Sequence, residues 1–259
     1  MDAKRELAKR LAVLRREGKQ QSGLAANLVP PDARVAYEIA GMVADELGWG
    51  VAGWKIAATN AEMQSALRTD APIYGRVFEP NVRPTPFAVE HARLSSPIPE
   101  VEYQVRLGAD LPARASAYVL DEVADAVASV HPGIELAECR FIHDADFPPL
   151  PAILADGAGS GTLVYGPAIE GWRNQDIANQ AVTLFCNDEL RRQGTAKAAL
   201  EHPLVPLTWL ANELSRTGVG LMAGQLVSTG TMTGMLRPKP GDCYIADFGA
   251  LGQVSATYT

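Results

Sequence analysis

Two glutamates alternate in the short segment Pro99-Glu100-Val101-Glu102-Tyr103. If this segment is a β-strand, residues two apart point to the same face, so the two carboxylates lie side by side. Such a pair is tolerated in water, or around a hard divalent cation such as Mg²⁺, which prefers oxygen ligands. The pair therefore predicts either the solvated face of a strand or two ligands of a metal ion.

A third acid, Glu135, lies in a second β-like run between Ile134 and Leu136. If those two neighbours face the core, alternation places Glu135 on the opposite face, where it would complete a magnesium-type set of three carboxylates. Glu138 then points away from Glu135, and we do not expect it to be a ligand. A solvent-exposed glutamate is the other interpretation of Glu135.

Lys55 is the charged residue of the otherwise apolar run Val51–Thr59. A lysine in such a strand must reach water along its stem, pair with an acid or take part in chemistry. Buried lysines change their pKa readily and serve in proton transfer. Lys55 is therefore either a catalytic proton carrier or a side chain that extends to the surface.

Two segments rich in small and hydroxyl-bearing residues, 155–162 and 227–234, are candidate anion sites. Small residues let backbone N–H groups approach an anion, and serine and threonine add hydroxyl groups. The other interpretations are a plain tight loop for the first segment and a threonine-rich strand for the second. The residues that we single out as candidates for substrate binding are Asp156, Ser160, Thr229, Gly230 and Thr231.

The elements that position these residues begin with two helices. Leu7, Leu11 and Leu14 recur at spacings of four and three, which predicts a helix that ends near Gly18. Asp32 follows two prolines and is placed to cap a second helix.

From Val51 onward, short β-type runs alternate with glycine and proline, and two further helices interrupt them. One of these helices spans about 204–216 and stops at Gly218. The other is expected to be capped by Asp121 and to carry Val123, Val127 and Val130. The expected strands are Val51–Ala57, Glu100–Leu107, Gly133–Phe141, Gly161–Tyr165, Ala181–Phe185, Gln225–Thr229, Asp242–Phe248 and Gln253–Tyr258.

Many strands with few, grouped helices predict an α+β fold. We expect an N-terminal helical cap, residues 1–50, packed on one continuous mixed β-rich body, residues 51–259. The pair Asn187-Asp188 lies between two strand-like runs and predicts a hairpin.

The chain has 259 residues, of which 47% are hydrophobic and 20% charged, as in an ordinary globular protein. No apolar run reaches the roughly 18 residues of a membrane span, and the charged N-terminal segment lacks the apolar core of a secretion signal. The net charge of −7 gives no basic field for nucleic acid. We therefore expect a cytoplasmic protein without nucleic-acid or membrane partners. The dispersed cysteines, which predict reduced thiols and no zinc site, are Cys139, Cys186 and Cys243.

Taken in order, these segments resemble the 2-keto-4-pentenoate hydratases and 4-oxalocrotonate decarboxylases, a branch of the fumarylacetoacetate hydrolase superfamily. Each motif is modest alone, but the shared order and spacing extend over nearly the whole chain. The matching stretches are Gly53–Asn60, Pro72–Gly75, Pro99–Glu102, Gly133–Glu135, Ala155–Gly161, His202–Asn212, Ala223–Thr231, Gly241-Asp242 and Leu251–Val254.

The resemblance implies a mixed β-roll of the fumarylacetoacetate hydrolase C-terminal-domain type, with an N-terminal helical cap and a homo-oligomeric assembly. It implies that Glu100, Glu102 and Glu135 bind Mg²⁺ or Mn²⁺. Lys55 falls on the family's active-site lysine and Ser160 on the serine of its substrate loop, so the resemblance implies that both are catalytic residues. The implied substrate is a small keto or enol acid.

The function that the resemblance implies first is hydration of a 2-hydroxypenta-2,4-dienoate in aromatic catabolism. Hydratases of this branch commonly carry an acid where this chain has Ile73, so decarboxylation of a 4-oxalocrotonate-type 2-oxo acid, which needs no positioned water, is the close alternative. A C–C hydrolase or tautomerase of the wider superfamily ranks third. A non-catalytic metabolite-binding homologue is a different class, and the retained charges of the candidate site argue against it.

Overall fold

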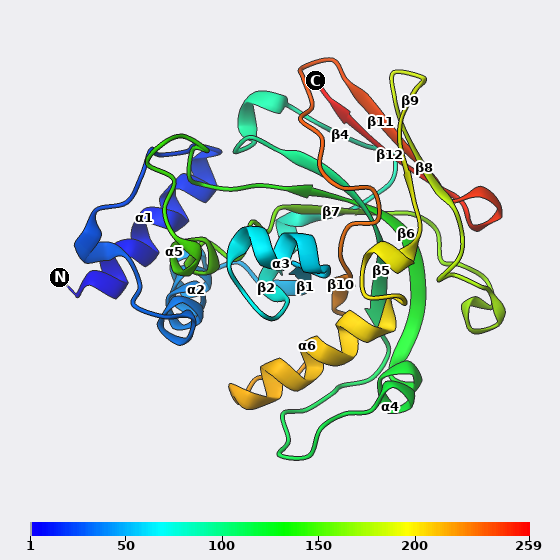
Figure 1. Ribbon diagram of the computed structural model, residues 1–259, viewed down its shortest axis with the longest axis horizontal. Helices are drawn as coiled ribbons and strands as arrows, with labels where there is room; N and C mark the ends of the chain where they lie inside the picture. The colour runs from blue at the N-terminus through cyan, green and yellow to red at the C-terminus, as the bar shows by residue number, and fades with distance from the viewer. Residues whose placement is uncertain (1) are drawn as a thin grey trace.

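The computed structural model describes residues 2–259 and combines N-terminal helices with curled β-sheets (Figure 1). The helices are α1 (Ala3–Glu17), α2 (Ala33–Leu47), α3 (Ala61–Leu67), α4 (Leu120–Asp125), α5 (Leu150–Ala155) and α6 (Leu204–Arg216). The strands are β1 (Val51–Ala57), β2 (Ile73–Phe78), β3 (Val82–Pro84), β4 (Phe87–Val89), β5 (Ile98–Leu107), β6 (Val127–Ala137), β7 (Thr162–Tyr165), β8 (Val182–Cys186), β9 (Glu189–Gly194), β10 (Leu226–Ser228), β11 (Cys243–Asp247) and β12 (Gln253–Tyr258).

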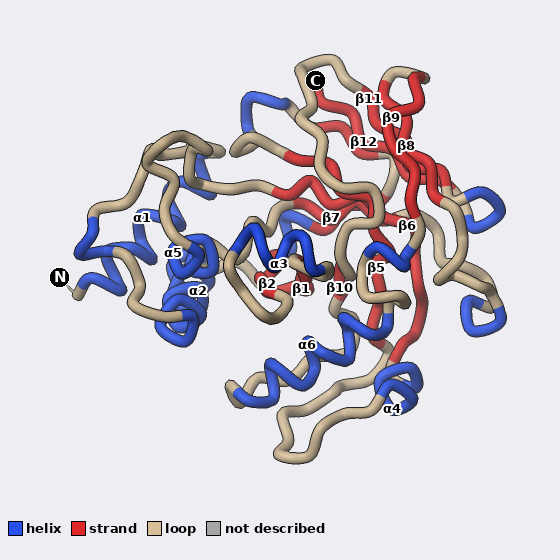
Figure 2. The backbone as a smooth tube through the Cα atoms, in the orientation of Figure 1, coloured by secondary structure: helices blue, strands red, loops and turns tan. Residues whose placement is uncertain are grey.

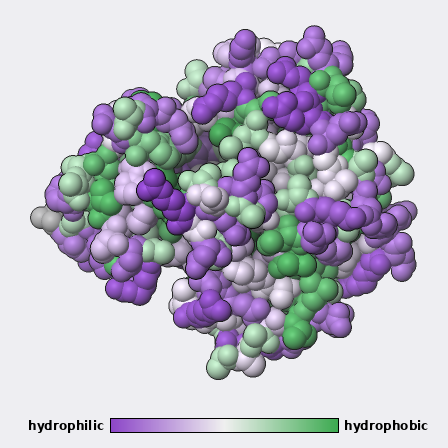
Figure 3. Space-filling model, in the orientation of Figure 1, coloured by the Kyte–Doolittle hydropathy of each residue, from purple (hydrophilic) through white to green (hydrophobic). Residues whose placement is uncertain are grey.

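The face of the molecule seen in Figure 3 is mostly hydrophilic, with hydrophobic residues in separate patches. Within residues 2–259, no helix has the length and apolar character needed to cross a membrane.

The two predicted N-terminal helices form where their capping residues place them. Gly18 adopts a left-handed φ of 60° and ends α1, because glycine takes this conformation without steric cost. The Asp32 carboxylate accepts a hydrogen bond of 2.8 Å from the Val35 amide and begins α2. Both helices turn an apolar face to the same buried cluster, to which Leu7 and Ile39 belong.

This helical cluster also includes parts of the chain that follow residue 50. Ile153 of α5 and Phe78 of β2 are buried with the apolar faces of α1 and α2. Figure 2 shows α1, α2 and α5 together at one end of the molecule, beside the strands. The division into residues 1–50 and 51–259 therefore stays a prediction.

The strands form two sheets, which pack on each other through β12 against β6 and β7. The order is β2-β1-β10-β5-β6-β7-β3 in the larger sheet and β4-β12-β11-β8-β9 in the smaller one. Both sheets contain parallel and antiparallel pairs. The mixed α+β architecture predicted from the sequence is confirmed.

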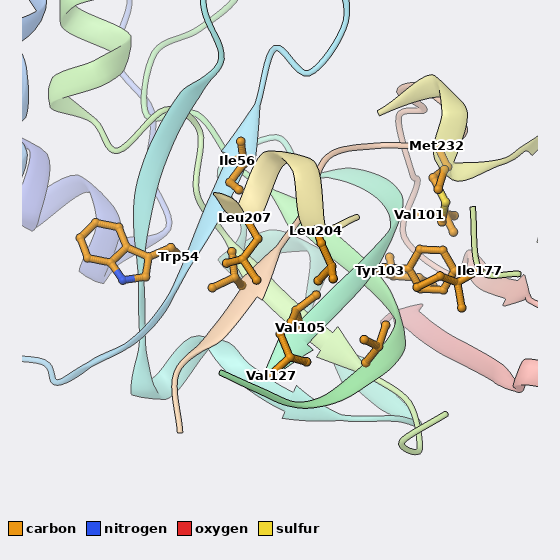
Figure 4. Packing of buried hydrophobic residues seen from close by; sticks show 14 of the residues in the cluster. Trp54, Ile56, Val101, Tyr103, Val105, Val127, Ile177, Leu204, Leu207 and Met232 are labelled. Carbon is orange, nitrogen blue, oxygen red and sulfur yellow. The ribbon is translucent and has the colours of Figure 1, made fainter. Parts of the chain in front are cut away.

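The main buried cluster lies between the two sheets and extends to α6. The rings of Tyr103 on β5 and Phe248 after β11 meet edge to face, with centroids 5.3 Å apart. Leu204 and Leu207 of α6 belong to the same cluster as Val105 on β5 (Figure 4). Burial of this apolar surface fixes the position of β5, the strand that carries two of the three candidate ligands.

The helix predicted at Asp121 is wrong beyond its first turns. α4 ends at Asp125, and Val127 and Val130 lie on β6. Asp121 lies in the first turn of α4 and does not cap the helix. The Glu122 carboxylate accepts a hydrogen bond from the Val119 amide instead. β6 is buried along most of its length, so it shows no polar alternation to separate it from a helix.

Other elements differ from the prediction in extent. Residues 133–141 were expected to form a strand, but the strand begins at Val127 and ends at Ala137. The short elements α3, α5, β2, β3 and β4 were not predicted. The hairpin at Asn187-Asp188 is confirmed: β8 and β9 pair antiparallel around these two residues, which have φ values of 51° and 65°.

Candidate metal centre

Three carboxylates meet on one face of the larger sheet. Glu100 on β5 lies directly opposite Glu135 on the antiparallel strand β6. Glu102 follows two residues after Glu100, so it points to the same face. One carboxylate oxygen from each residue lies within 4.8 Å of the others. The structure thus brings together the three acids that the sequence singled out as ligands.

Burial makes this cluster electrostatically unfavourable without a cation. Glu102 and Glu135 are 1% and 0% exposed, and Glu100 is half-buried. Burial raises the pKa of all three carboxyls. The neighbouring charges of Glu135 and Glu100 raise the pKa of Glu102 further, and the pKa of Glu135 rises to about 7.

The hydrogen bonds of the cluster leave one buried oxygen without a donor. Glu102 Oε2 accepts from the Ser228 hydroxyl and, at 2.7 Å, from the Gly230 amide. Glu135 Oε1 accepts from the Gly161 amide at 3.4 Å, whereas Glu135 Oε2 has no hydrogen-bond donor. Because a buried carboxylate oxygen without a hydrogen-bond donor is costly, this arrangement fits a hard divalent cation bound by carboxylate oxygens.

Lys55 supplies the positive charge nearest to that unpaired oxygen. Its Nζ lies 3.8 Å from Glu135 Oε2, and its side chain is almost fully buried. Burial by itself lowers the pKa of Lys55, but the charges of Glu135, Glu100 and Glu102 together outweigh it, so the pKa is raised. The structure therefore does not extend Lys55 to the surface: it holds the ammonium group inside the cluster.

The segment after β10 lies against the carboxylates. Gly230 has a φ of 105° and donates its amide to Glu102. A Cβ atom at Gly230 would overlap the Thr59 side chain, so the close approach requires glycine. Thr229 donates its hydroxyl to the Tyr103 carbonyl at 2.9 Å, while Thr231 lines the pocket beside Glu100.

Asp156 and Ser160 lie behind Glu135 in a network with two arginines. Arg140 Nε contacts Asp156 Oδ1 at 2.7 Å, and Arg15 Nη2 donates to Ser160 Oγ at 3.0 Å. Both arginines also donate to the Ser160 carbonyl. This loop reaches the carboxylates through the Gly161 amide. Contact of Asp156 or Ser160 with a substrate stays a prediction.

Neither arginine was predicted from the sequence. Arg140 lies inside the run 133–141, where a charged residue among apolar neighbours is a usable signal, as it was for Lys55. Arg15 has no local signal, because its partner Ser160 is 145 residues away.

Gly75 on β2 makes room for the loop that contains Asp156 and Ser160, since a Cβ atom at Gly75 would overlap the Gly157 carbonyl oxygen.

Two adjoining pockets open beside the cluster and share Glu100 in their walls. The first has a volume of about 350 Å³, and its wall includes Glu102, Thr59, Asn60 and Thr231. The second has a volume of about 150 Å³, includes Lys55, and is otherwise mostly apolar. A small molecule held at Glu100 therefore has one polar and one apolar pocket available.

The fold and the site define a β-roll protein in which three carboxylates, suited to bind a divalent cation, lie beside a buried lysine. Residues 55–258 match the fumarylacetoacetate (FAA) hydrolase C-terminal family, and the chain belongs to this family. This match confirms the resemblance found in the sequence.

Relatives and solved structures agree with this membership. The 2-keto-4-pentenoate hydratase of Burkholderia vietnamiensis is 30% identical over 257 residues, covering 98% of this chain and 96% of that protein. The 4-oxalocrotonate decarboxylase of Pseudomonas putida is 27% identical over 214 residues, covering 83% and 80%. A structure of 4-oxalocrotonate decarboxylase from Pseudomonas putida G7, complexed with magnesium and adipate, superimposes with a TM-score of 0.90 at 24% identity, covering 99% and 97% of the two chains.

Proposed function

We propose that the protein is a divalent-metal-dependent lyase that hydrates a small 2-hydroxy-2,4-dienoate of the 2-hydroxypenta-2,4-dienoate type. The observation that carries the proposal is the buried Glu135 Oε2, which has no hydrogen-bond donor, in a cluster of three carboxylates beside Lys55. The hydratase relative that is similar over almost the full chain supports this choice of reaction.

The proposed ligands of the metal are Glu100, Glu102 and Glu135, and the proposed metal is Mg²⁺ or Mn²⁺. When bound, the cation supplies a Lewis acid that stabilises negative charge on the keto or enol oxygen of the substrate. Ser228 and Gly230 orient the Glu102 carboxylate through their hydrogen bonds. Gly161 does the same for Glu135.

Lys55 is the proposed proton carrier. Its Nζ is buried and charged beside Glu135, so the ammonium group can give a proton to C5 as the substrate ketonises, and the resulting amine takes up the proton of the enol hydroxyl. Water then adds across the remaining carbon–carbon double bond, with hydroxyl on C4 and a proton on C3. The product is a 4-hydroxy-2-keto acid, and no oxidant or reductant is consumed.

We propose that the loop containing Asp156 and Ser160 positions the substrate carboxylate and the Glu135 side chain. The Arg15 and Arg140 contacts hold this loop in place. Thr229, Gly230 and Thr231 form the opposite edge of the proposed substrate site. A role in aromatic catabolism, a cytoplasmic location and a homo-oligomeric state belong to the same proposal, and light scattering coupled to size exclusion tests the last of these.

Decarboxylation is the second candidate, and one observation favours it. Ile73 is a buried apolar residue in the wall of the pocket that contains Lys55, where an acid would help to position water. Loss of CO₂ from a 2-oxo acid needs a stabilised enolate and a proton donor, but no positioned water.

Product analysis separates the candidates. The purified protein is incubated with Mg²⁺ and enzymatically generated 2-hydroxypenta-2,4-dienoate or 2-hydroxymuconate, with ultraviolet detection and mass spectrometry. A product that gains the mass of water identifies a hydratase, and release of CO₂ identifies a decarboxylase. Chelation with EDTA should abolish either activity. If neither compound reacts although both bind, the protein is a non-catalytic metabolite-binding homologue and the proposal is wrong.

A further inference from the structure

The apolar pocket beside Lys55 has walls from several parts of the chain. Its volume is about 150 Å³, and an apolar cavity of about that size accepts a benzene molecule. Its large apolar side chains come from α3, β2, β5, the segment 147–153 and the segment after β10. They are Met63, Leu67, Ile73, Ile98, Phe147, Ile153 and Met235.

The charges in this pocket leave no partner for a carboxylate at the far end of a substrate. Lys55 faces Glu135 at 3.8 Å, and Glu100 and Glu138 add negative charge to the wall. The remaining basic residue is His143, and burial and the nearby charge of Arg237 lower its pKa, which disfavours its charged form.

The polar pocket on the other side of Glu100 does not supply a cation either. Among the residues that the structure describes in its wall there is no lysine, arginine or histidine, and Glu62 is an additional acid. A dicarboxylate would therefore place its second carboxylate without a positive partner in either orientation. An unpaired charge in such a site is costly.

We propose that the substrate of this site is a monocarboxylic 2-keto or 2-hydroxydienoic acid whose far end is an apolar group, up to the size of a phenyl ring. The apolar pocket takes this group, and Leu67 and Ile73 determine the preference against a second carboxylate. This proposal rests on the proposed function, because it assigns the carboxylate end of the substrate to the metal centre.

Two unreactive probes test the preference directly. The acids 2-oxohexanoate and 2-oxoadipate have the same number of carbons and differ only in a terminal methyl or carboxylate group. Isothermal titration calorimetry in the presence of Mg²⁺ should give at least about tenfold tighter binding of 2-oxohexanoate, since a buried polar group left unpaired discriminates strongly. Equal binding, tighter binding of 2-oxoadipate, or no binding of either acid would overturn the proposal.

Variants assign the preference to the pocket. Leu67→Arg and Met235→Arg each add a cation to the wall of the apolar pocket. Because Met235 is 50% exposed, at least the second variant should fold. Each should shift the ratio of the two dissociation constants at least about tenfold toward 2-oxoadipate. The matched control Ala66→Arg adds the same charge to the exposed side of α3, outside the pocket, and should leave the ratio within about twofold. An unchanged ratio in a folded Met235→Arg protein contradicts the proposal.

Turnover distinguishes failure of this proposal from failure of the proposed function. If the binding preference holds but no dienoate is converted, only the proposed function is wrong. If dienoates are converted while 2-oxoadipate binds as well as 2-oxohexanoate, the assignment of the apolar pocket is wrong and the reaction stands.

Discussion

Replacing Lys55 with methionine removes the charge inside the carboxylate cluster while keeping much of the side-chain length. The Nζ–Oε2 distance to Glu135 is 3.8 Å, at which two unit charges attract by about 4 kcal/mol with an effective dielectric constant of about 20. Without this attraction, the metal-free Lys55→Met protein should be less stable above neutral pH than the wild type. Bound Mg²⁺ should restore most of that stability, because it supplies the missing positive charge.

The kinetic effect should separate from the binding effect. Proton transfer by a positioned side chain contributes about 10²–10⁴-fold to a rate, so kcat of Lys55→Met should fall by about this factor. Mg²⁺ should bind at least as tightly as in the wild type, because a repelling cation has been removed. Circular dichroism checks the fold, calorimetry measures the metal affinity, and ultraviolet absorbance of a 2-hydroxydienoate measures turnover.

Lys55→Arg is the matched control. Arginine keeps the positive charge beside Glu135 but does not release a proton in proteins. If Lys55 moves protons, Lys55→Arg should lose turnover as Lys55→Met does, while keeping the stability of the metal-free protein. Turnover of either folded, metal-loaded variant within about threefold of wild type would refute the role of Lys55 in proton transfer, since that role is worth about 10²-fold or more.

Four further outcomes follow from the same geometry. Glu102→Gln should weaken Mg²⁺ binding at least about 100-fold in calorimetry, beyond the 10–100-fold cost of changes outside the ligand sphere; unchanged affinity would exclude Glu102 as a ligand. Glu138→Gln should keep turnover within a few-fold, because Glu138 accepts a hydrogen bond from the Ser95 amide at 2.8 Å and glutamine can do the same; a loss as large as that of Glu135→Gln would contradict this. The pKa of Glu135 is raised to about 7, so its protonated carboxyl stabilises the metal-free fold at low pH. This stabilisation is lost as the pH rises through about 7. The gain in Tm on adding Mg²⁺ should therefore grow from pH 6 to pH 8, and a constant gain would refute the assignment of Glu135 as a metal ligand. Glu201 is exposed and has a φ of 70°. Glu201→Gly should stabilise the folded protein by about 1 kcal/mol, because it removes about 1–2 kcal/mol of left-handed backbone strain and adds the smaller entropic cost of glycine. A Tm rise of about 2–4 °C is expected, and Glu201→Gln should show no rise.

One part of the ligand set was accessible from local sequence geometry, and the rest was implied by the family resemblance. The period of two in a strand places Glu100 and Glu102 on one face, and one antiparallel pairing then brings Glu135 opposite Glu100. Lys55 gave a comparable signal, since a lone charge in an apolar strand needs a partner. These local patterns left other interpretations open, and the resemblance over nearly the whole chain selected the metal site and the active-site lysine.

Other parts of the site depend on contacts that no local pattern encodes. Arg15 reaches Ser160 only because α1 packs beside α5 and the loop that follows it. The walls of the apolar pocket combine Leu67 and Phe147, which are brought together by loops with weak sequence signals. β6 was mistaken in part for a helix because burial on both faces removes the alternation that identifies a strand.

The contact between Arg15 and Ser160 has a consequence for synthesis of the chain. The two residues are separated by 145 positions, and at about 5–20 residues per second a ribosome needs roughly 7–30 s to cover that distance. Until the end of this interval the arginine has no access to its hydrogen-bond partners on Asp156 and Ser160, and α1 can pack only against the segments already made, of which α2 is the nearest. The loop that supports Glu135 can close only after Ser160 has left the ribosome, so the metal centre should assemble late during translation, and a nascent chain that stops before residue 160 should not bind the cation.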